Sequence, residues 1–88
     1  MSSQFEQLKT QLEEQDWPAV YFFKFISPSD SETIAKVTSL FGSDADLKMR
    51  SSRKGNYISI SIKEVMLNTA EVIKVYEKAA KIKGVISL

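Results

Sequence analysis

The residues best suited to bind a ligand lie in one short stretch near the middle of the chain. Arg50, Arg53 and Lys54 bring three cations together, and Gly55 follows them. A glycine lets backbone N–H groups approach a ligand with no Cβ in the way. With the neighbouring hydroxyl and amide groups, this set suits an anion such as phosphate or a carboxylate. The predicted ligand-binding residues are Arg50, Ser51, Ser52, Arg53, Lys54, Gly55, Asn56 and Tyr57.

The same stretch also has a plain structural interpretation. Residues 52–56 separate two segments of alternating polarity, have the length of a hairpin loop, and include a glycine for a position with positive φ. Cations next to such a loop protect an edge strand from pairing with other chains. The sequence leaves both interpretations open.

Catalysis is disfavoured by composition. The chain has no histidine and no cysteine, so it lacks the commonest general base, the strongest nucleophile and any thiolate metal ligand. Glu32 and Glu71 are expected to cap helices, and Asp44 and Asp46 are typical of turns. No phosphate-binding loop, dinucleotide motif or metal-ligand spacing is present. We expect no catalytic residues, no metal site and no cofactor, and therefore no enzyme.

Length and charge favour one small soluble domain. The chain has 88 residues, a net charge of +1 and 43% hydrophobic residues, and its pI of about 7.9 is lower than that of most nucleic-acid-binding domains. No apolar run approaches the ~18 residues of a membrane span, and the N-terminus lacks the features of a signal peptide. We expect a cytoplasmic protein with no membrane partner.

Helix-capping residues and hydrophobic periodicity delimit the elements. Ser29 with Glu32 has the spacing of a capping box, Asn68 with Glu71 gives a second N-terminal signal, and Gly42 suits a helix end. The predicted helices cover residues 3–15, 30–41 and 70–84, and the strands cover residues 19–26, 45–51, 57–62 and 85–88. The last helix is expected to bury Val72, Ile73, Tyr76, Ala79 and Ala80.

The order of these elements predicts an α+β fold. After an N-terminal amphipathic extension at residues 1–16, residues 17–88 read as a ferredoxin-like βαββαβ sandwich. Right-handed crossovers place two helices on one face of a four-stranded antiparallel sheet and make the first and third strands central. The other face is left open. The side chains expected there are those of Val20, Phe22, Lys24, Ile26, Lys48, Arg50, Tyr57, Ser59 and Ser61.

The open face is a second candidate site, for a protein partner or a nucleic acid, centred on Val20, Phe22, Lys24 and Ile26. Exposed apolar side chains of this kind mark interaction surfaces. A homodimer would cover them, or the N-terminal helix would fold back over them with Phe5, Leu8 and Leu12; the sequence does not separate these two arrangements.

Nucleic-acid binding is disfavoured on this face. "RKGNYISISI" partly matches the RNA-recognition signature, but Asn56 and Ile58 stand at its first two aromatic positions. Only Phe22 and Tyr57 are then placed to stack on bases.

From Trp17 onward the chain resembles the YbeD-like family of small bacterial proteins of unknown function. The resemblance rests on "WP" before the first strand, on the aromatic strand with Lys24, and above all on "SSRKGNYISISI". It covers nearly the whole chain. The resemblance implies a βαββαβ fold similar to the regulatory ACT domains, which bind small effectors.

These observations together favour a non-enzymatic regulatory module that binds a small anionic effector or a protein partner. Two alternatives stand beside it. One is binding of single-stranded RNA through Lys24, Arg50, Phe22 and Tyr57. The other is a purely structural homodimer.

Overall fold

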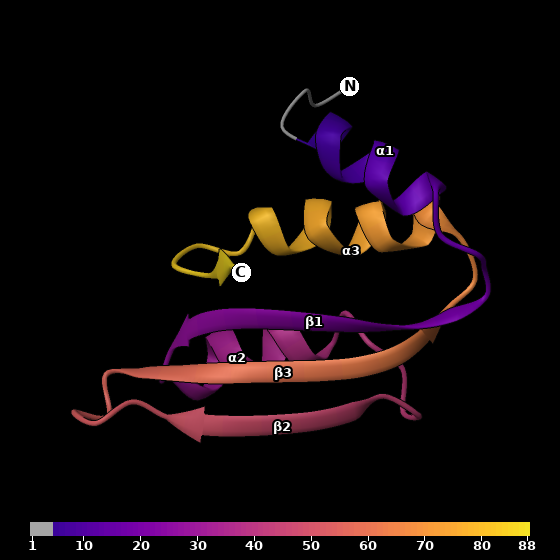
Figure 1. Cartoon of the computed structure of the whole chain (residues 1–88). Helices are drawn as coiled ribbons and strands as arrows, with labels where there is room; N and C mark the ends of the chain where they lie inside the picture. Colours follow the sequence, from indigo (N-terminus) through magenta and orange to yellow (C-terminus); the bar gives the residue numbers. More distant parts are fainter. Residues whose placement is uncertain (1–4) are drawn as a thin grey trace.

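The computed structural model describes residues 5–88, so the predicted start of the first helix at Ser3 lies outside the described residues. Three helices and four strands follow one another along the chain (Figure 1). Their order is α1 (Glu6–Glu13), β1 (Ala19–Pro28), α2 (Ser31–Thr38), β2 (Asp46–Ser51), β3 (Tyr57–Met66), α3 (Thr69–Ala80) and β4 (Ile86–Ser87).

The four strands form one antiparallel sheet in the order β2-β3-β1-β4. The first and third strands of the chain are therefore central, as predicted, and the fold is α+β with a ferredoxin-like arrangement. β1 and β3 pair over their whole length, from Ala19 opposite Met66 to Pro28 opposite Tyr57. Both strands are longer than predicted, and β4 is only two residues long.

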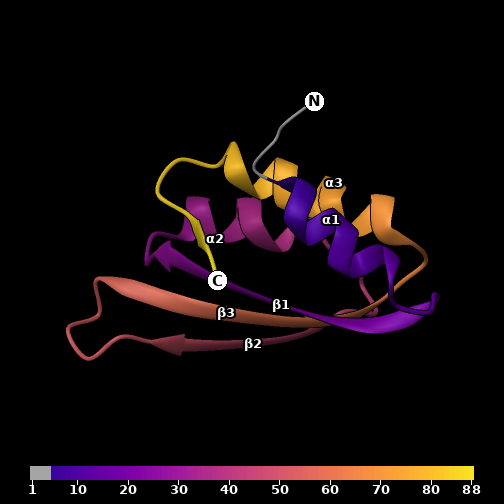
Figure 2. The same cartoon turned by 45° about the horizontal axis from the view of Figure 1, so that its top comes forward.

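All three helices lie on the same side of the sheet (Figures 1 and 2). α1 lies against α3, with the rings of Phe5 and Tyr76 6.3 Å apart. Leu12 is buried in the core, and its carbonyl accepts a hydrogen bond of 3.0 Å from the indole N–H of Trp17. The arrangement in which α1 covers the open sheet face is therefore wrong. The apolar side chains of α1 pack instead against α3 and the aromatic end of β1.

The core lies between the sheet and the helices and is largely aromatic. Phe23 and Phe25 of β1 are fully buried, as are Ile60 and Ile62, which pair with them on β3. The ring of Phe23 lies 5.4 Å from that of Tyr76. Burying aromatic side chains of this size removes a large apolar area from water, so this side of the sheet supplies most of the hydrophobic stabilisation.

Helix α2 differs from its prediction at both ends. Its N-cap is Asp30, whose carboxylate accepts a 2.8 Å hydrogen bond from the N–H of Thr33. The predicted capping box of Ser29 and Glu32 is therefore wrong, because Ser29 uses its hydroxyl to hold the hairpin loop instead. The helix ends at Thr38, three residues earlier than Phe41, and the chain continues in tight turns.

Gly42 follows those turns but does not adopt the positive φ expected of a helix-ending glycine. Its N–H donates a 3.0 Å hydrogen bond to the carboxylate of Glu64. A Cβ at this position would lie 3.1 Å from that carboxylate oxygen. The glycine is explained by this close approach between the α2–β2 connection and β3.

Helix α3 begins as predicted, because the side chain of Asn68 accepts a 2.9 Å hydrogen bond from the N–H of Glu71. Its buried face differs from the prediction at three positions: Val75 is buried, Ile73 is only half-buried, and Ala80 is exposed. After the helix, Gly84 has a φ of +87°, and a Cβ there would lie 3.0 Å from the ring of Pro28. The turn into β4 therefore lies too close to the end of β1 to leave room for a side chain at this position.

Candidate binding face

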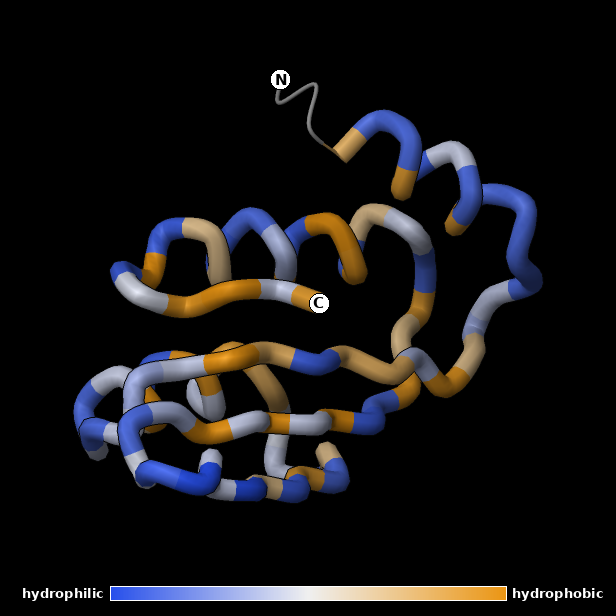
Figure 3. Tube along the Cα trace, turned by 60° about the vertical axis from the view of Figure 1, so that its left-hand side comes forward, coloured by the Kyte–Doolittle hydropathy of each residue, from blue (hydrophilic) through white to orange (hydrophobic). Residues whose placement is uncertain are grey.

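No element of residues 5–88 covers the side of the sheet away from the helices, and we call this side the open face. Strand register places its side chains in rows. One row across β1, β3 and β2 consists of Lys24, Ser61 and Lys48. The next row consists of Ile26, Ser59 and Arg50. Side chains directly opposite one another on adjacent strands are close enough to act together. The structure therefore brings Lys24, Lys48 and Arg50 onto one surface, as predicted. Figure 3 shows how hydrophilic and hydrophobic residues alternate along the strands.

The apolar part of the open face runs along β1, its neighbour β4 and the end of β3. Phe22 is 53% exposed and Val20 is 62% exposed, and Val65 lies opposite Val20. Exposed apolar side chains are common singly but are informative when they lie together. The exposed large apolar residues of this face are Val20, Phe22, Tyr57, Val65, Ile86 and Leu88.

The charged part of the open face lies mainly over β2 and β3. The strands place four cations here, and Asp46 is the one carboxylate among their open-face residues. No ion pair involving these cations occurs within residues 5–88. The Lys63 ammonium lies 5.9 Å from the centre of the Phe22 ring, where the face of the ring attracts it. The four cations are Lys24, Lys48, Arg50 and Lys63.

The predicted anion-binding loop forms the tight turn between β2 and β3. The N–H of Ser52 donates to the carbonyl of Tyr57 at 2.8 Å, and the N–H of Gly55 donates to the carbonyl of Ser52 at 3.0 Å. Gly55 has a φ of +75°, and its carbonyl accepts a hydrogen bond from the hydroxyl of Ser29. Several backbone donors are thus used within the turn. An anion bound here would depend mainly on the exposed side chains of Arg53 and Lys54.

The two aromatic residues named for base stacking lie far apart. Phe22 is opposite Lys63 on β3, whereas Tyr57 is six residues before Lys63 on that strand. At about 3.3 Å per residue, the separation along the sheet is roughly 20 Å. Two successive bases cannot span that distance, so the rings do not form one stacking platform of the kind that RNA-recognition domains use.

Lys63 and Val65 were missed by the sequence analysis, which ended this strand at Ile62. The alternation of polarity breaks down after Ile62, because two charged residues, Lys63 and Glu64, are followed by two apolar ones, Val65 and Met66. In the structure Glu64 does point inward, at the edge of the core, where it accepts the hydrogen bond from Gly42. The β-branched Val65 and the apolar Met66, which precede the N-cap residue Asn68, were the signal that could have extended the strand.

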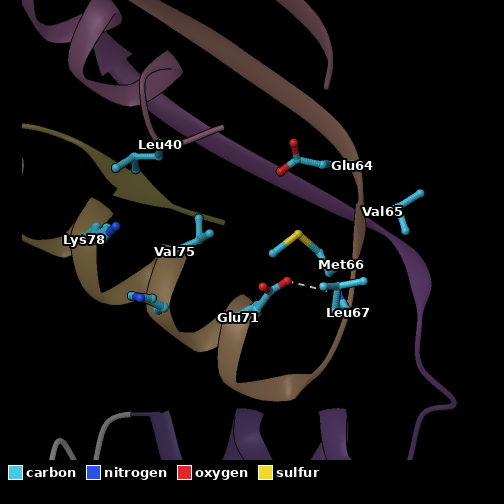
Figure 4. A pocket seen from close by; sticks show the side chains of 9 residues that line it. Leu40, Glu64, Val65, Met66, Leu67, Glu71, Val75 and Lys78 are labelled. Carbon is cyan, nitrogen blue, oxygen red and sulfur yellow. Dashed lines mark hydrogen bonds between the residues drawn. The ribbon is translucent and has the colours of Figure 1, made fainter. Parts of the chain in front are cut away.

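A cleft of about 480 Å³ lies on the helix side, between the end of α2, the end of β3 and α3 (Figure 4). The carboxylate of Glu71 lies in it and accepts a 3.1 Å hydrogen bond from the N–H of Leu67. Glu64 is similarly engaged with Gly42. The two carboxylates of the cleft thus have structural roles. The lining residues are Leu40, Glu64, Val65, Met66, Leu67, Glu71, Lys74, Val75 and Lys78.

Two further features of residues 5–88 bear on function. Within them, no three or more Asp, Glu, His or Cys side chains gather in a way that could hold a metal ion. None of the helices that the structure describes has both the length and the apolar character needed to cross a membrane.

Comparison with known proteins places the chain in a family. A search of curated proteins finds no match, and a search of solved structures finds none either. A family model described as "Protein of unknown function (DUF493)" matches residues 13–88, which include the whole sheet and both helices α2 and α3. The YbeD-like resemblance is consistent with this match, and the similarity to ACT domains stays an expectation. The chain belongs to the DUF493 family.

Proposed function

We propose that this protein is a non-catalytic, regulatory binding module whose open face binds an acidic segment of a protein partner. The observation that carries the proposal is the combination on one surface of four cations, one carboxylate and several exposed apolar side chains. Charge complementarity would select an acidic partner and speed its association. The apolar side chains would supply the burial that keeps it bound.

The lateral division of the open face supports a protein segment over a small anion. Apolar side chains lie along β1 and β4, whereas Lys48 and Arg50 project from β2. An amphipathic protein segment has both an apolar and an acidic side and would match this division. A small anion would use the cations alone. The absence of His and Cys from the sequence supports binding over catalysis.

The alternatives fit the open face less well. In a homodimer that packs open face against open face, the cations of one copy would approach those of the other, which is unfavourable without counter-charges. RNA would meet cations and serines, but the stacking rings Phe22 and Tyr57 lie about 20 Å apart.

The proposal is tested with a fluorescent synthetic peptide that alternates glutamate and valine, titrated with the protein at low and moderate salt. The double variant Lys24→Ala/Lys48→Ala should bind about tenfold more weakly, because each exposed ion pair contributes up to about 1 kcal/mol. Binding by the unaltered protein should also weaken as salt rises.

The matched control is Lys74→Ala/Lys78→Ala, which removes the same charge from α3, on the helix side of the sheet. It should bind nearly as well as the unaltered protein. Equal losses in both double variants would mean that the peptide responds to net charge and not to the open face. Tighter binding of oligouridine than of the peptide would favour RNA and overturn the proposal.

A further inference from the structure

Strand β2 forms one edge of the sheet, and every one of its six residues is exposed. In an antiparallel sheet, the backbone groups of successive residues point to opposite sides of the strand. On β1, the carbonyl of Lys24 points to β4, where it accepts a 2.9 Å hydrogen bond from Leu88. The registers of β1 with β3 and of β3 with β2 then fix the direction of the backbone groups of β2.

By this alternation, Lys48 and Arg50 exchange hydrogen bonds with Ser61 and Ser59 of β3. The turn bond from Ser52 to the carbonyl of Tyr57 continues the same pattern. The N–H and C=O groups of Leu47, Met49 and Ser51 therefore point away from the sheet. These groups are the ones that an added strand would use.

The side chains of β2 point alternately to the helix side of the sheet and to the open face. Leu47 and Met49 point to the helix side of the sheet, opposite the buried Ile62 and Ile60. They nevertheless remain 39% and 46% exposed, because no element of residues 5–88 covers them at this edge. Lys48 and Arg50 point to the open face.

We propose that the edge of β2 receives an extended segment of the partner as a fifth strand, in which acidic and apolar residues alternate. Every second side chain would lie beside Leu47 and Met49, and the intervening ones beside Lys48 and Arg50. Apolar residues match the first set and carboxylates match the second. This inference rests on the proposed function, since it specifies how the acidic segment reaches the open face.

Charge and geometry favour this occupant over others. A second copy of the chain that pairs β2 with β2 antiparallel about Met49 would place Lys48 of each copy across from Arg50 of the other, and like charges directly opposite are destabilising. At the other edge of the sheet, β4 already pairs with β1 at Phe25 and Ile26. The two residues of β4 and the first part of β1 are left there, and neither forms a continuous edge as long as the six residues of β2.

The test uses the glutamate–valine peptide in two N-methylated forms. Methylation of the alternate amides that face β2 should abolish strand pairing and weaken binding at least tenfold, because each methyl group replaces a hydrogen-bond donor. Methylation of the other amides leaves charge, size and composition the same and should preserve binding. Equal affinities of the two forms would overturn the fifth strand, while the proposed function would still stand because both forms bind.

Amide hydrogen exchange gives a second readout on the same complex. The amides of Leu47 and Met49 should exchange quickly in the free protein and at least tenfold more slowly with the peptide bound. The amides of Lys48 and Arg50 should be slow in both states. New protection at Val20 and Phe22 instead would place the peptide on the opposite edge and overturn the inference. Binding of neither peptide form, nor of the unmethylated peptide, would overturn the proposed function itself.

A pair of protein variants separates edge pairing from a general response to added negative charge. Met49→Glu places a carboxylate among the apolar residues of the added strand and should reduce affinity at least tenfold. Ala80→Glu adds the same charge at an exposed position of α3, on the helix side of the sheet, and should change affinity about twofold or less. Equal losses in the two variants would mean that the peptide responds to net charge and does not pair with β2. Far-ultraviolet circular dichroism confirms that both variants are folded.

Discussion

The two sides of the sheet use the same strands for different purposes, and neighbouring residues show the contrast best. On β1, Phe23 is fully buried under the helices, whereas Phe22, one position earlier, is 53% exposed on the open face. On β3, Ile60 and Ile62 are fully buried, whereas Ser61 between them lies on the open face. Three helices cover the first side, and none of residues 5–88 covers the second (Figure 2). One side therefore stabilises the fold, and the side chains of the other side stay exposed to solvent.

The largest expected effect comes from truncating one phenylalanine on each side of β1. Phe23→Ala should lower the free energy of unfolding by about 3–5 kcal/mol, because it removes buried apolar area and leaves a cavity. Phe22→Ala should lower it by less than about 1 kcal/mol. Urea denaturation of both variants measures the difference. A comparable loss in Phe22→Ala would show that the open face is covered in solution.

A smaller effect is expected from the two glycines with positive φ. Gly84 lies in the packed turn before β4, and a Cβ there would meet Pro28, whereas a Cβ on Gly55 in the hairpin would meet nothing within 4 Å. Gly55→Ala should cost roughly 1–2 kcal/mol from backbone strain alone. Gly84→Ala should cost more, because it adds a steric clash to the same strain. Equal costs, measured by thermal and urea denaturation, would mean that Pro28 moves aside freely.

The hydroxyl groups of two tyrosines give the next comparison. Tyr76 is buried, and its hydroxyl lies 3.2 Å from that of Tyr21. Tyr76→Phe should cost about 1 kcal/mol, because it leaves a partly buried hydroxyl without its partner. Tyr57→Phe removes a hydroxyl from an exposed side chain and should change stability by less than about 0.5 kcal/mol. A larger effect at Tyr57 than at Tyr76 would reverse the assignment of the two sides.

The smallest expected effect is a pH dependence of stability that arises from Tyr76, on the helix side of the sheet. Burial raises the pKa of the Tyr76 hydroxyl, and its hydrogen bond with Tyr21 raises it further. The unfolded chain loses this proton near pH 10, so above that pH the folded state holds more protons than the unfolded state. Stability should therefore fall as pH rises past about 10.

The matched measurement is the free energy of unfolding of the unaltered protein and of Tyr76→Phe between pH 8 and pH 11. The variant should lose less stability over this range, since it lacks the shifted group. Parallel curves for the two proteins would contradict the assignment of the pH dependence to Tyr76.

The contrast between the two sides was visible in the sequence only in part. The alternation of Ile58, Ile60 and Ile62 with polar residues predicted which side of β3 is buried, because a strand turns successive side chains to opposite faces. The same logic placed Lys24, Lys48 and Arg50 on the open face. The predicted strand ended at Ile62, since the carboxylate of Glu64 does not suit a buried face. The hydrogen-bond partner of Glu64 is Gly42, which is 22 residues away in the chain.

Local signals at the helix ends were equally mixed. Asn68 caps α3 as predicted, because asparagine is among the residues most favoured at a helix N-cap. Ser29 and Asp30 are both good capping residues, and the sequence favoured the wrong one. The choice depended on a contact between Ser29 and Gly55, in a loop that becomes a neighbour only when β1 pairs with β3.

The sequence by itself determined the order of the strands and helices, the buried side of each strand and the cationic, serine-rich character of the other side. These follow from local periodicity, which has the same meaning wherever the strand lies. Only the tertiary structure decided that α1 packs against α3, that no element of residues 5–88 covers the open face, and that Leu47 and Met49 remain exposed at an edge. Each of these outcomes depends on how far a neighbouring element reaches, which no local pattern of residues records.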